Sequence, residues 1–277
     1  MNLKKFNLSN SVAFITGGGG FLGRQHAEAL LKSGATVVLS DISNEGLENS
    51  FNFLKDQFNK NKIIKIYADV TKPASIQEAK DTINKKNLFI DVLINNAAID
   101  PKVKEDLDLD YSSRLESFDL SEWNKQIAVG LTGALNCIKI FGPDMAKSEK
   151  NCVILNVASD LSVIAPDQRI YEKRGISEES QQVKPVTYSV IKSGLVGLTK
   201  YVATYWSRQG VRCNALSPGG IKNNQSEEFI SRINNLIPMD RMAQIDEYHG
   251  AIQFLCSEAS SYMTGQNLVI DGGRSIW

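Results

Sequence analysis

Residues 11–23 read Ser-Val-Ala-Phe-Ile-Thr-Gly-Gly-Gly-Gly-Phe-Leu-Gly, and the helical pattern of residues 24–32 follows at once. A β-rich apolar run, a glycine turn and a helix therefore come in the order of a phosphate-binding unit. Glycine permits positive φ and close backbone approach, and the start of the helix attracts anions. Four consecutive glycines can also form only a tight turn, but the flanking elements favour a pyrophosphate-binding turn over residues 16–23.

Short apolar runs alternate with longer amphipathic stretches through the rest of the chain. The predicted buried strands are residues 12–15, 37–39, 63–67, 92–94, 152–157, 211–215 and 268–270. Strands that alternate with helices form parallel sheets with right-handed crossovers, so the pattern predicts an α/β, doubly wound fold. Ligands of such folds bind at the carboxyl ends of the strands.

The chain is predicted to form one domain over residues 1–277, because no repeat and no linker rich in Pro, Gly or Ser divides it. Three polar segments interrupt the pattern after predicted strands, at about residues 100–119, 160–185 and 222–240. Lids and substrate loops belong at such positions, although solvated surface loops have the same composition.

The charge composition limits the classes of partner. The chain has 31 Lys and Arg residues against 31 Asp and Glu residues. No basic field attracts nucleic acid or anionic lipid, and a small-molecule partner is expected. No apolar stretch suits a signal sequence or a membrane span, which predicts a soluble, cytoplasmic protein.

The cysteines are expected to be reduced core residues. They lie far apart, without a CxxC spacing, and only two histidines are present to assist a metal; the four are Cys137, Cys152, Cys213 and Cys256. Because each lies inside an apolar segment, we expect neither a disulfide nor a metal site.

An acidic residue ends the second predicted strand. Asp41 lies 18 residues beyond Gly23, where a carboxylate can bond the adenosine ribose of a dinucleotide and repel a 2′-phosphate. No Arg or Lys at residues 17–22 or 40–43 offsets that repulsion. The sequence therefore favours NAD over NADP, with a helix N-cap or turn aspartate as the alternative.

Tyr188 and Lys192 stand at i and i+4 on a helix predicted to extend to about residue 208, so they share one face. A phenol with a pKa of about 10 is a weak base at neutral pH, but a nearby cation favours the phenolate. The pair can then exchange a proton with a substrate oxygen. Taken alone, this spacing is common on exposed helices.

The motifs, in order and along nearly the whole chain, resemble the short-chain dehydrogenase/reductase family. They are the glycine turn 16–23, Asp41, Asp69-Val70, Asn95-Asn96-Ala97-Ala98, Ser159, Tyr188 with Lys192, Pro218-Gly219 and Asp271-Gly272-Gly273. The resemblance implies a Rossmann fold with a mostly parallel seven-stranded sheet. It also implies hydride transfer between NAD and a secondary alcohol or ketone, and a homotetramer or homodimer.

The resemblance assigns roles to individual residues. Ser159 would hold the substrate oxygen, Tyr188 would exchange the proton, and Lys192 would bind the nicotinamide ribose and lower the pKa of the tyrosine. The implied cofactor-binding residues are Gly17, Gly20, Phe21, Leu22, Gly23, Asp41, Asp69, Val70, Asn95, Ala97, Tyr188, Lys192, Pro218, Gly219, Ile221 and Asn223. Each can instead be structural, since Asn95 often ties neighbouring strands in this fold. Ser162 is a nearby alternative to Ser159.

The chain departs from the family pattern at the glycine turn and before the active-site helix. Phe21 replaces a usual glycine, which gives the spacing of the extended sugar-nucleotide branch, although no segment matches that branch's long C-terminal domain. Gly130 replaces the asparagine that ordinarily kinks its helix and holds a water of the proton relay. Glycine still allows the helix to open, but without the side-chain donor we expect slower or differently relayed proton transfer.

The third departure is the distance of 29 residues between Ser159 and Tyr188, which leaves a large polar insertion. The polar side chains expected over the site are Asp167, Gln168, Arg169, Tyr171, Arg174, Asn223, Asn224 and Gln225. Sugar hydroxyls need paired donors and acceptors, and an Arg fork can take a phosphate. An exposed polar loop remains the alternative.

These side chains favour a dehydrogenase of a sugar or sugar phosphate. Residues 165–171, Lys184-Pro185 and residues 272–277 also resemble, loosely, members associated with bacterial surface-sugar and flagellin-glycan biosynthesis. An NAD-retaining sugar epimerase and a cofactor-binding protein with impaired catalysis remain open.

Overall fold

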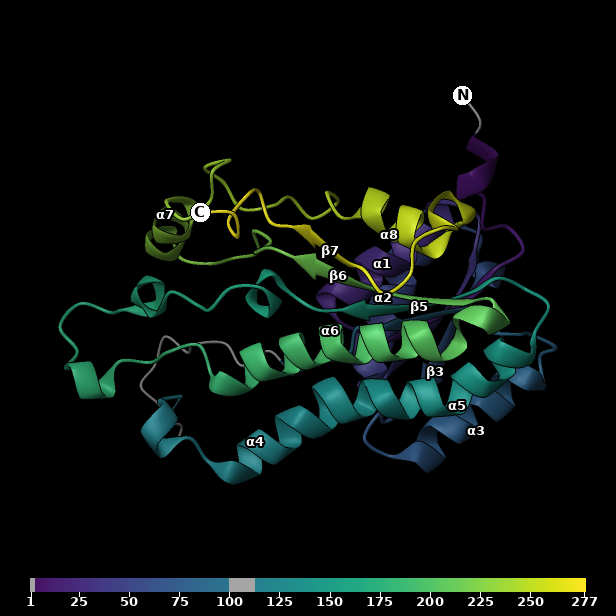
Figure 1. The fold of residues 1–277 in the computed structure, drawn as a ribbon, viewed down its shortest axis with the longest axis horizontal. Helices are drawn as coiled ribbons and strands as arrows, with labels where there is room; N and C mark the ends of the chain where they lie inside the picture. The colour runs from purple at the N-terminus through teal and green to yellow at the C-terminus, as the bar shows by residue number, and fades with distance from the viewer. Residues whose placement is uncertain (1–2, 100–112) are drawn as a thin grey trace.

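A parallel sheet forms the centre of the molecule in the computed structural model, which describes residues 3–99 and 113–277 (Figure 1). Its strands are β1 Val12–Thr16, β2 Thr36–Asp41, β3 Ile63–Tyr67, β4 Val92–Asn95, β5 Cys152–Val157, β6 Val211–Pro218 and β7 Asn267–Ile270. All pairs are parallel, in the order β3-β2-β1-β4-β5-β6-β7. The predicted single-domain Rossmann fold is confirmed, and each predicted strand lies within an observed one.

Helices cover both faces of the sheet, which is why its strands are apolar on both sides. One face carries α1 Phe21–Lys32, α2 Asn44–Lys55 and α8 His249–Cys256, and the other carries α3 Pro73–Asn84, α5 Gly133–Lys147 and α6 Val186–Trp206. Figure 1 shows α8 above strands β5–β7, and α5 and α6 below them. Each layer buries its own apolar cluster against the strands.

The strand order reverses between β1 and β4, because β1 pairs with β2 on one side and with β4 on the other. Ligands of doubly wound sheets bind beyond the carboxyl ends of the strands at such a point. The shorter helices α4 Leu120–Ile127 and α7 Glu227–Asn234, together with the 160–185 insertion, lie towards the carboxyl ends of β6 and β7 (Figure 1).

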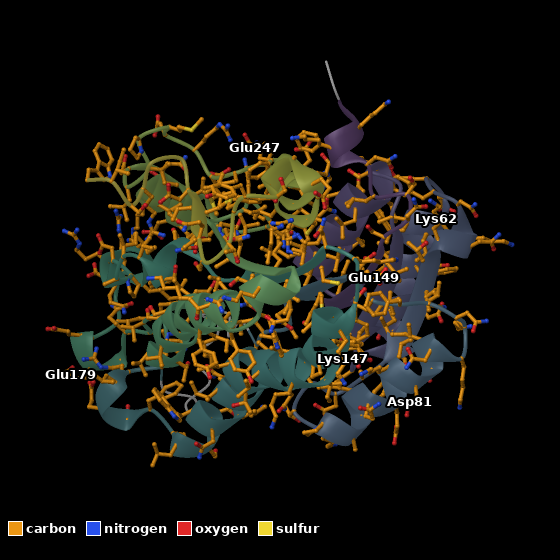
Figure 2. The ribbon with its side chains drawn as sticks, turned by 45° about the vertical axis from the view of Figure 1, so that its right-hand side comes forward. Lys62, Asp81, Lys147, Glu149, Glu179 and Glu247 are labelled. Carbon is orange, nitrogen blue, oxygen red and sulfur yellow. The ribbon has the colours of Figure 1, made fainter. Side chains whose placement is uncertain are left out.

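The predicted insertions differ in structure. Residues 160–185 form three short 3-10 turns, Asp160–Ser162, Gln168–Tyr171 and Glu178–Ser180, joined by irregular chain. Figure 2 shows Glu179 of the last turn at the outer edge of the molecule. Residues 222–240 contain α7, and most of the 100–119 segment lies outside the described residues.

All four cysteines are free and buried, so the prediction of reduced core residues is confirmed. Burial raises the pKa of each thiol to about 12, which leaves them protonated at neutral pH. Within residues 3–99 and 113–277, no helix has the length and apolar character needed to cross a membrane.

Candidate active site

The glycine turn after β1 leaves no room for side chains. Gly17 has a φ of 66°, and a Cβ on Gly23 would lie 2.1 Å from the carbonyl oxygen of Gly17. A Cβ on Gly18 would lie 2.9 Å from Cα of Leu39 in β2. The turn therefore presses the backbone against its neighbours and forms a cradle that any larger residue would fill.

Helix α1 opens directly out of this cradle. Its N-cap, Gly20, makes no side-chain capping hydrogen bond, and the first turn holds no acidic residue. The N–H groups of a first helical turn have no partner inside the helix and attract anions. Phe21 is already the first helical residue, so it does not occupy the tight part of the turn. This geometry fits the pyrophosphate of a dinucleotide, despite the unusual glycine spacing.

Asp41, the last residue of β2, holds the turn from the side. One carboxylate oxygen accepts from the backbone N–H of Gly19 at 3.0 Å and the other from the N–H of Ser43 at 2.9 Å. The structure therefore gives Asp41 the turn-forming role considered as the alternative. Because each carboxylate oxygen has two lone pairs, these bonds leave acceptor capacity for ribose hydroxyls.

The carboxyl ends of β1 and β4 are joined by a short polar network. The Thr16 hydroxyl accepts from the backbone N–H groups of Asn96 and Ala97, each at 3.0 Å, and the Asn96 amide donates to the carbonyl of Thr16 at 2.9 Å. Asn95 donates to Asn156 of β5 at 2.8 Å, so the strand-tying role expected of Asn95 is present. Its own amide oxygen is buried without a partner among the described residues.

Asp69 and Val70 lie after β3. Burial raises the pKa of Asp69, but hydrogen bonds from the hydroxyl and N–H of Thr71, with help from Lys72, outweigh it and lower the pKa overall. Val70 is buried, and its carbonyl accepts from Asn136 of α5 at 3.0 Å. Both residues are therefore fixed in place at the edge of the sheet.

Tyr188 and Lys192 lie on the first turns of α6, which begins two residues earlier at Val186. Lys192 is buried, and its Nζ lies 5.5 Å from the centre of the Tyr188 ring. The same Nζ donates to the carbonyl of Val157, at the end of β5, at 2.9 Å. A second cation, Lys184, places its Nζ 3.9 Å from the centre of the Tyr188 ring. The predicted pair is thus brought together against β5.

Ser159 lies two residues beyond the end of β5 and is buried. Its hydroxyl donates to Asp160 at 2.8 Å, and Asp160 forms a buried ion pair with Arg274 at 2.8 Å. The alternative, Ser162, bonds Ser217 at 2.9 Å in a group of polar side chains between β5 and β6. That bond gives Ser162 a structural partner, whereas Ser159 adjoins the segment that Lys192 contacts.

The helical segment that precedes α5 widens into a π-helical turn at Gly130, where the family usually has an asparagine. Residues Ala128–Thr132 form a π-helical turn between α4 and α5, with Gly130 buried at its centre. A Cβ on Gly130 would lie 2.8 Å from Cγ2 of Ile191, the residue before Lys192. Glycine therefore allows the expected opening, and Ile191 fills the space that a side chain at position 130 would need.

The last predicted cofactor-binding segment follows β6. Gly219 packs against Asp271, since a Cβ on it would lie 2.8 Å from Cα of that residue, and Pro218 ends the strand. Ile221 forms a parallel bridge with Ala243. Asn223 is exposed, and its N–H donates to the side chain of Gln225 at 2.6 Å.

The polar side chains of the insertion mostly bond within the protein. Arg169 forms a two-pronged pair with Asp167, at 2.9 and 2.6 Å. Gln168 accepts from the backbone N–H of Lys184 at 2.8 Å. Tyr171 packs against Phe229 of α7, with ring centres 5.7 Å apart. The side chain of Arg174 is 94% exposed and lies 4.0 Å from Glu228, while Gln225 donates to the carbonyl of Ile221.

Four residues of this region were given no role in the site from the sequence. They are Asp160 and Arg274 beside Ser159, Lys184 over Tyr188, and Ile191 against Gly130. Asp160 directly follows the predicted serine, and Arg274 directly follows the Asp271-Gly272-Gly273 motif. Their nearness to predicted site motifs could therefore have marked both as candidate site residues. The ion pair between them could not have been found from the sequence, because 114 positions separate the two residues.

Comparisons with known proteins agree with this arrangement. Residues 21–275 match the family model described as enoyl-(acyl carrier protein) reductase. The chain is 30% identical to an NAD-dependent glycerol dehydrogenase of Listeria innocua over 282 residues, covering 99% of this chain and 97% of the relative.

Two solved structures have the same fold over nearly their whole length. A short-chain dehydrogenase of Leptospira borgpetersenii with bound NAD⁺ has a TM-score of 0.82 at 31% identity, covering 99% of this chain and 95% of that one. A gluconate 5-dehydrogenase of Burkholderia cenocepacia in complex with NADP and tartrate has a TM-score of 0.83 at 26% identity, covering 99% of both chains.

Proposed function

Because the chain belongs to the short-chain dehydrogenase/reductase family, we propose that it is an NAD-dependent dehydrogenase that oxidises a secondary alcohol of a small polyol or sugar. The observation that carries the proposal is the position of Lys192. Its Nζ lies 5.5 Å from the centre of the Tyr188 ring and bonds the carbonyl of Val157, two residues before Ser159. The proton-transfer pair and the serine therefore adjoin at the carboxyl end of β5.

The preference for NAD rests on the charge at the end of β2. The Asp41 carboxylate is held by Gly19 and Ser43, at the side of the glycine cradle. A 2′-phosphate on the adenosine ribose would meet this carboxylate, and no Arg or Lys at residues 17–22 or 40–43 would balance the charge. One of the similar structures contains NAD⁺ and the other contains NADP, so the fold alone does not decide between the two cofactors. The preference for NAD in this chain rests on Asp41.

The residues of the site divide the chemistry among them. NAD held by the glycine cradle and Asp41 would supply the hydride acceptor for the carbon that carries the reacting hydroxyl. Tyr188 Oη takes the proton of that hydroxyl, and Lys192 stabilises the phenolate that does so. Ser159 Oγ holds the same oxygen in place. The carbonyl of Val157 fixes the ammonium of Lys192, which keeps the cation beside the tyrosine.

An uncharged substrate suits the site better than a sugar phosphate. The guanidinium of Arg169, the expected phosphate fork, already pairs with both oxygens of Asp167. Arg169 is therefore not held ready to receive a phosphate. The relatives named for glycerol and gluconate both support a small polyhydroxylated substrate, and of these two only glycerol is uncharged.

The test is the formation of NADH from NAD with a panel of polyols and sugars, followed by absorbance, with NADP in parallel. We expect turnover with NAD and at least one polyol. Tyr188→Phe should lower kcat by a factor of roughly 100 to 10,000 while NAD binding is unchanged. Turnover only with NADP would contradict the cofactor assignment. Light scattering of the same preparation tests the expected homotetramer or homodimer.

The same assay separates the remaining alternatives. A sugar epimerase would convert its substrate without net NADH, and a protein with impaired catalysis would bind NAD but be insensitive to Tyr188→Phe. The glycine spacing at Phe21 is the feature that favours the epimerase. The π-helical turn at Gly130 opens the helix as expected and so counts against impaired catalysis.

A further inference from the structure

A second cation lies over the ring of Tyr188. The Nζ of Lys184 is 3.9 Å from the ring centre, closer than the Nζ of Lys192 at 5.5 Å. Lys184 is half-buried, near the end of the 160–185 insertion and two residues before α6 begins. The proton transfer proposed above involves Lys192 and assigns no part to Lys184.

A cation over the ring acts differently on the two protonation states of a tyrosine. It attracts a neutral phenol only weakly, through the negative face of the ring. A phenolate carries a full negative charge, part of which spreads over the ring carbons, so the same cation attracts it more strongly. The position of Lys184 therefore favours the form of Tyr188 that takes a proton from an alcohol.

Gln168 of the insertion holds the backbone of Lys184 on both sides. Its side-chain oxygen accepts from the N–H of Lys184 at 2.8 Å, and its NH₂ group donates more weakly to the carbonyl of the same residue, at 3.5 Å. Gln168 opens a 3-10 turn that is anchored in turn by Ile170, which is buried in an apolar cluster with residues of α7. The insertion therefore sets where the lysine side chain begins relative to Tyr188.

The neighbouring charges are paired with one another. The ion pairs on the segments that adjoin the start of α6 are Asp160 with Arg274 after β5, Asp167 with Arg169 in the insertion, and Glu122 with Lys125 on α4. His26, which lies near Lys192, is neutral because burial lowers its pKa to about 4. Within residues 3–99 and 113–277, Lys184 and Lys192 therefore leave a net positive charge beside the ring.

We infer that Lys184, placed by Gln168, is a positioning residue that stabilises the phenolate form of Tyr188 and so lets the proton transfer proceed at lower pH. The insertion then contributes to the chemistry of the site as well as to its rim. This inference rests on the proposed role of Tyr188 and adds the group that sets the pH at which Tyr188 works.

The test is a pH titration of Tyr188 itself, followed by NMR on the full chain with isotope-labelled tyrosines. The chain has eight tyrosines, and Tyr188→Phe identifies the signal of Tyr188 by removing it. Lys184→Met removes the charge but keeps a long unbranched side chain. The midpoint of the Tyr188 titration should rise by about 1 pH unit in this variant. Lys184→Arg should leave it close to the wild-type value, because arginine keeps the charge.

The matched control is Lys200→Met, which removes the same charge from an exposed position of α6. Lys200 lies roughly 18 Å along the helix from Tyr188, where salt screens its charge. Its removal should leave the Tyr188 midpoint unchanged. The inference would be overturned by an unchanged midpoint in Lys184→Met, by equal shifts in the two lysine variants, or by a wild-type midpoint that is not below about 10.

Gln168→Ala tests whether the insertion places the lysine. Loss of the two bonds to the backbone of Lys184 should loosen its position and raise the Tyr188 midpoint, by less than Lys184→Met does. In the double variant with Lys184→Met, the change at Gln168 should have no further effect. No shift in Gln168→Ala, or an undiminished shift in the double variant, would overturn the role given to the insertion.

The pH dependence of kcat gives a second readout with any polyol that reacts. Oxidation needs the phenolate, so kcat should rise with pH up to the Tyr188 midpoint and level off above it. Lys184→Met should lower kcat by a factor of roughly 10 below both midpoints and leave it unchanged above them. A higher KM at every pH, with an unshifted kcat profile, would mean that Lys184 contacts the substrate instead and would overturn the inference.

The two measurements distinguish failure of this inference from failure of the proposed function. If no polyol gives NADH but the Tyr188 midpoint shifts as expected, the proposed substrate class is wrong and the role of Lys184 stands. If a polyol reacts through Tyr188 but the midpoint does not move in Lys184→Met, the proposed function stands and the role of Lys184 is wrong.

Discussion

The cofactor half of the molecule, residues 11–99, and the substrate rim, residues 160–185 and 222–240, use polar side chains differently. In the cofactor half, Thr16, Asp41 and Asn96 bond backbone atoms of neighbouring segments. In the rim, Gln168 and Gln225 also bond backbone atoms, but the charged Arg169 pairs with a side chain two residues away. Backbone bonding shapes a crevice that a motif can predict, whereas side-chain pairing removes groups that looked available for substrate.

The largest loss of stability is expected from Gly23→Ala, which tests how tightly the backbone of the cofactor half is packed. The added Cβ would lie 2.1 Å from the Gly17 carbonyl oxygen, which is backbone and cannot swing away. Overpacking of this kind should cost about 4 kcal/mol, beyond the usual range. Urea unfolding and titration with NAD measure the loss of stability and of cofactor binding.

The matched control in the rim is Gly175→Ala. Gly175 has a positive φ, of 80°, which the helical Gly23 does not have, but no atom lies within 4 Å of its Cβ position. The variant should lose only about 1 kcal/mol from the left-handed backbone and should bind NAD normally. An equal loss in both variants would mean that the close approach of the Gly17 carbonyl costs no more than a left-handed backbone conformation does.

The next largest effect concerns pH and His26, a buried residue of α1. Burial, followed by the nearby His249 and Lys192, lowers its pKa from 6.5 to about 4, although Asn96 opposes the shift. The folded protein therefore holds His26 neutral, and below pH 6.5 the unfolded chain binds the extra proton. Stability present above pH 6.5 should be lost towards pH 4, by roughly 3 kcal/mol in total.

Urea unfolding of wild type and His26→Gln at pH 7.5 and pH 5 measures this contribution. The variant should show a shallower dependence on pH in that window. If the free energy of unfolding changes equally with pH in both proteins, His26 is not the source of the pH dependence. The rim offers the contrasting case, since the hydrogen bond from Arg169 lowers the pKa of Asp167, and this group should act only at more acidic pH.

The sequence predicted the cofactor half well because its signals are local. Apolar runs gave the seven strands, and the glycines identified the turn between β1 and α1. Tyr188 and Lys192 were found because i and i+4 share a helix face. The ion pair of Asp160 with Arg274 could not be predicted, since only the folded chain joins residues 114 positions apart.

A third effect is expected where α5 meets the active-site helix, at Gly130. Gly130→Asn restores the residue usual in the family, but its Cβ would lie 2.8 Å from Cγ2 of Ile191. We expect a loss of about 2 kcal/mol and no gain in rate, because Ile191 must move first. The double variant with Ile191→Ala should be more stable than the sum of the single losses predicts.

The cycle compares wild type, the two single variants and the double variant. Urea unfolding measures the steric cost of each change, and reaction rates across pH measure its effect on proton transfer. Additive losses would mean that the two positions do not compete for space. A faster rate in Gly130→Asn alone would show that the missing amide limits proton transfer despite Ile191.

The smallest effect is expected in the rim, from Arg169→Ala. The Arg169 side chain is 79% exposed, and its guanidinium pairs with Asp167 rather than with an open site. Exposed pairs contribute little, so stability should change by less than about 0.5 kcal/mol. The KM for an active polyol should stay the same, and so should the KM for its phosphate ester if that ester reacts. A rise in KM for the ester alone would show that the arginine leaves Asp167 to bind phosphate, and the contrast between the two regions would then fail at this residue.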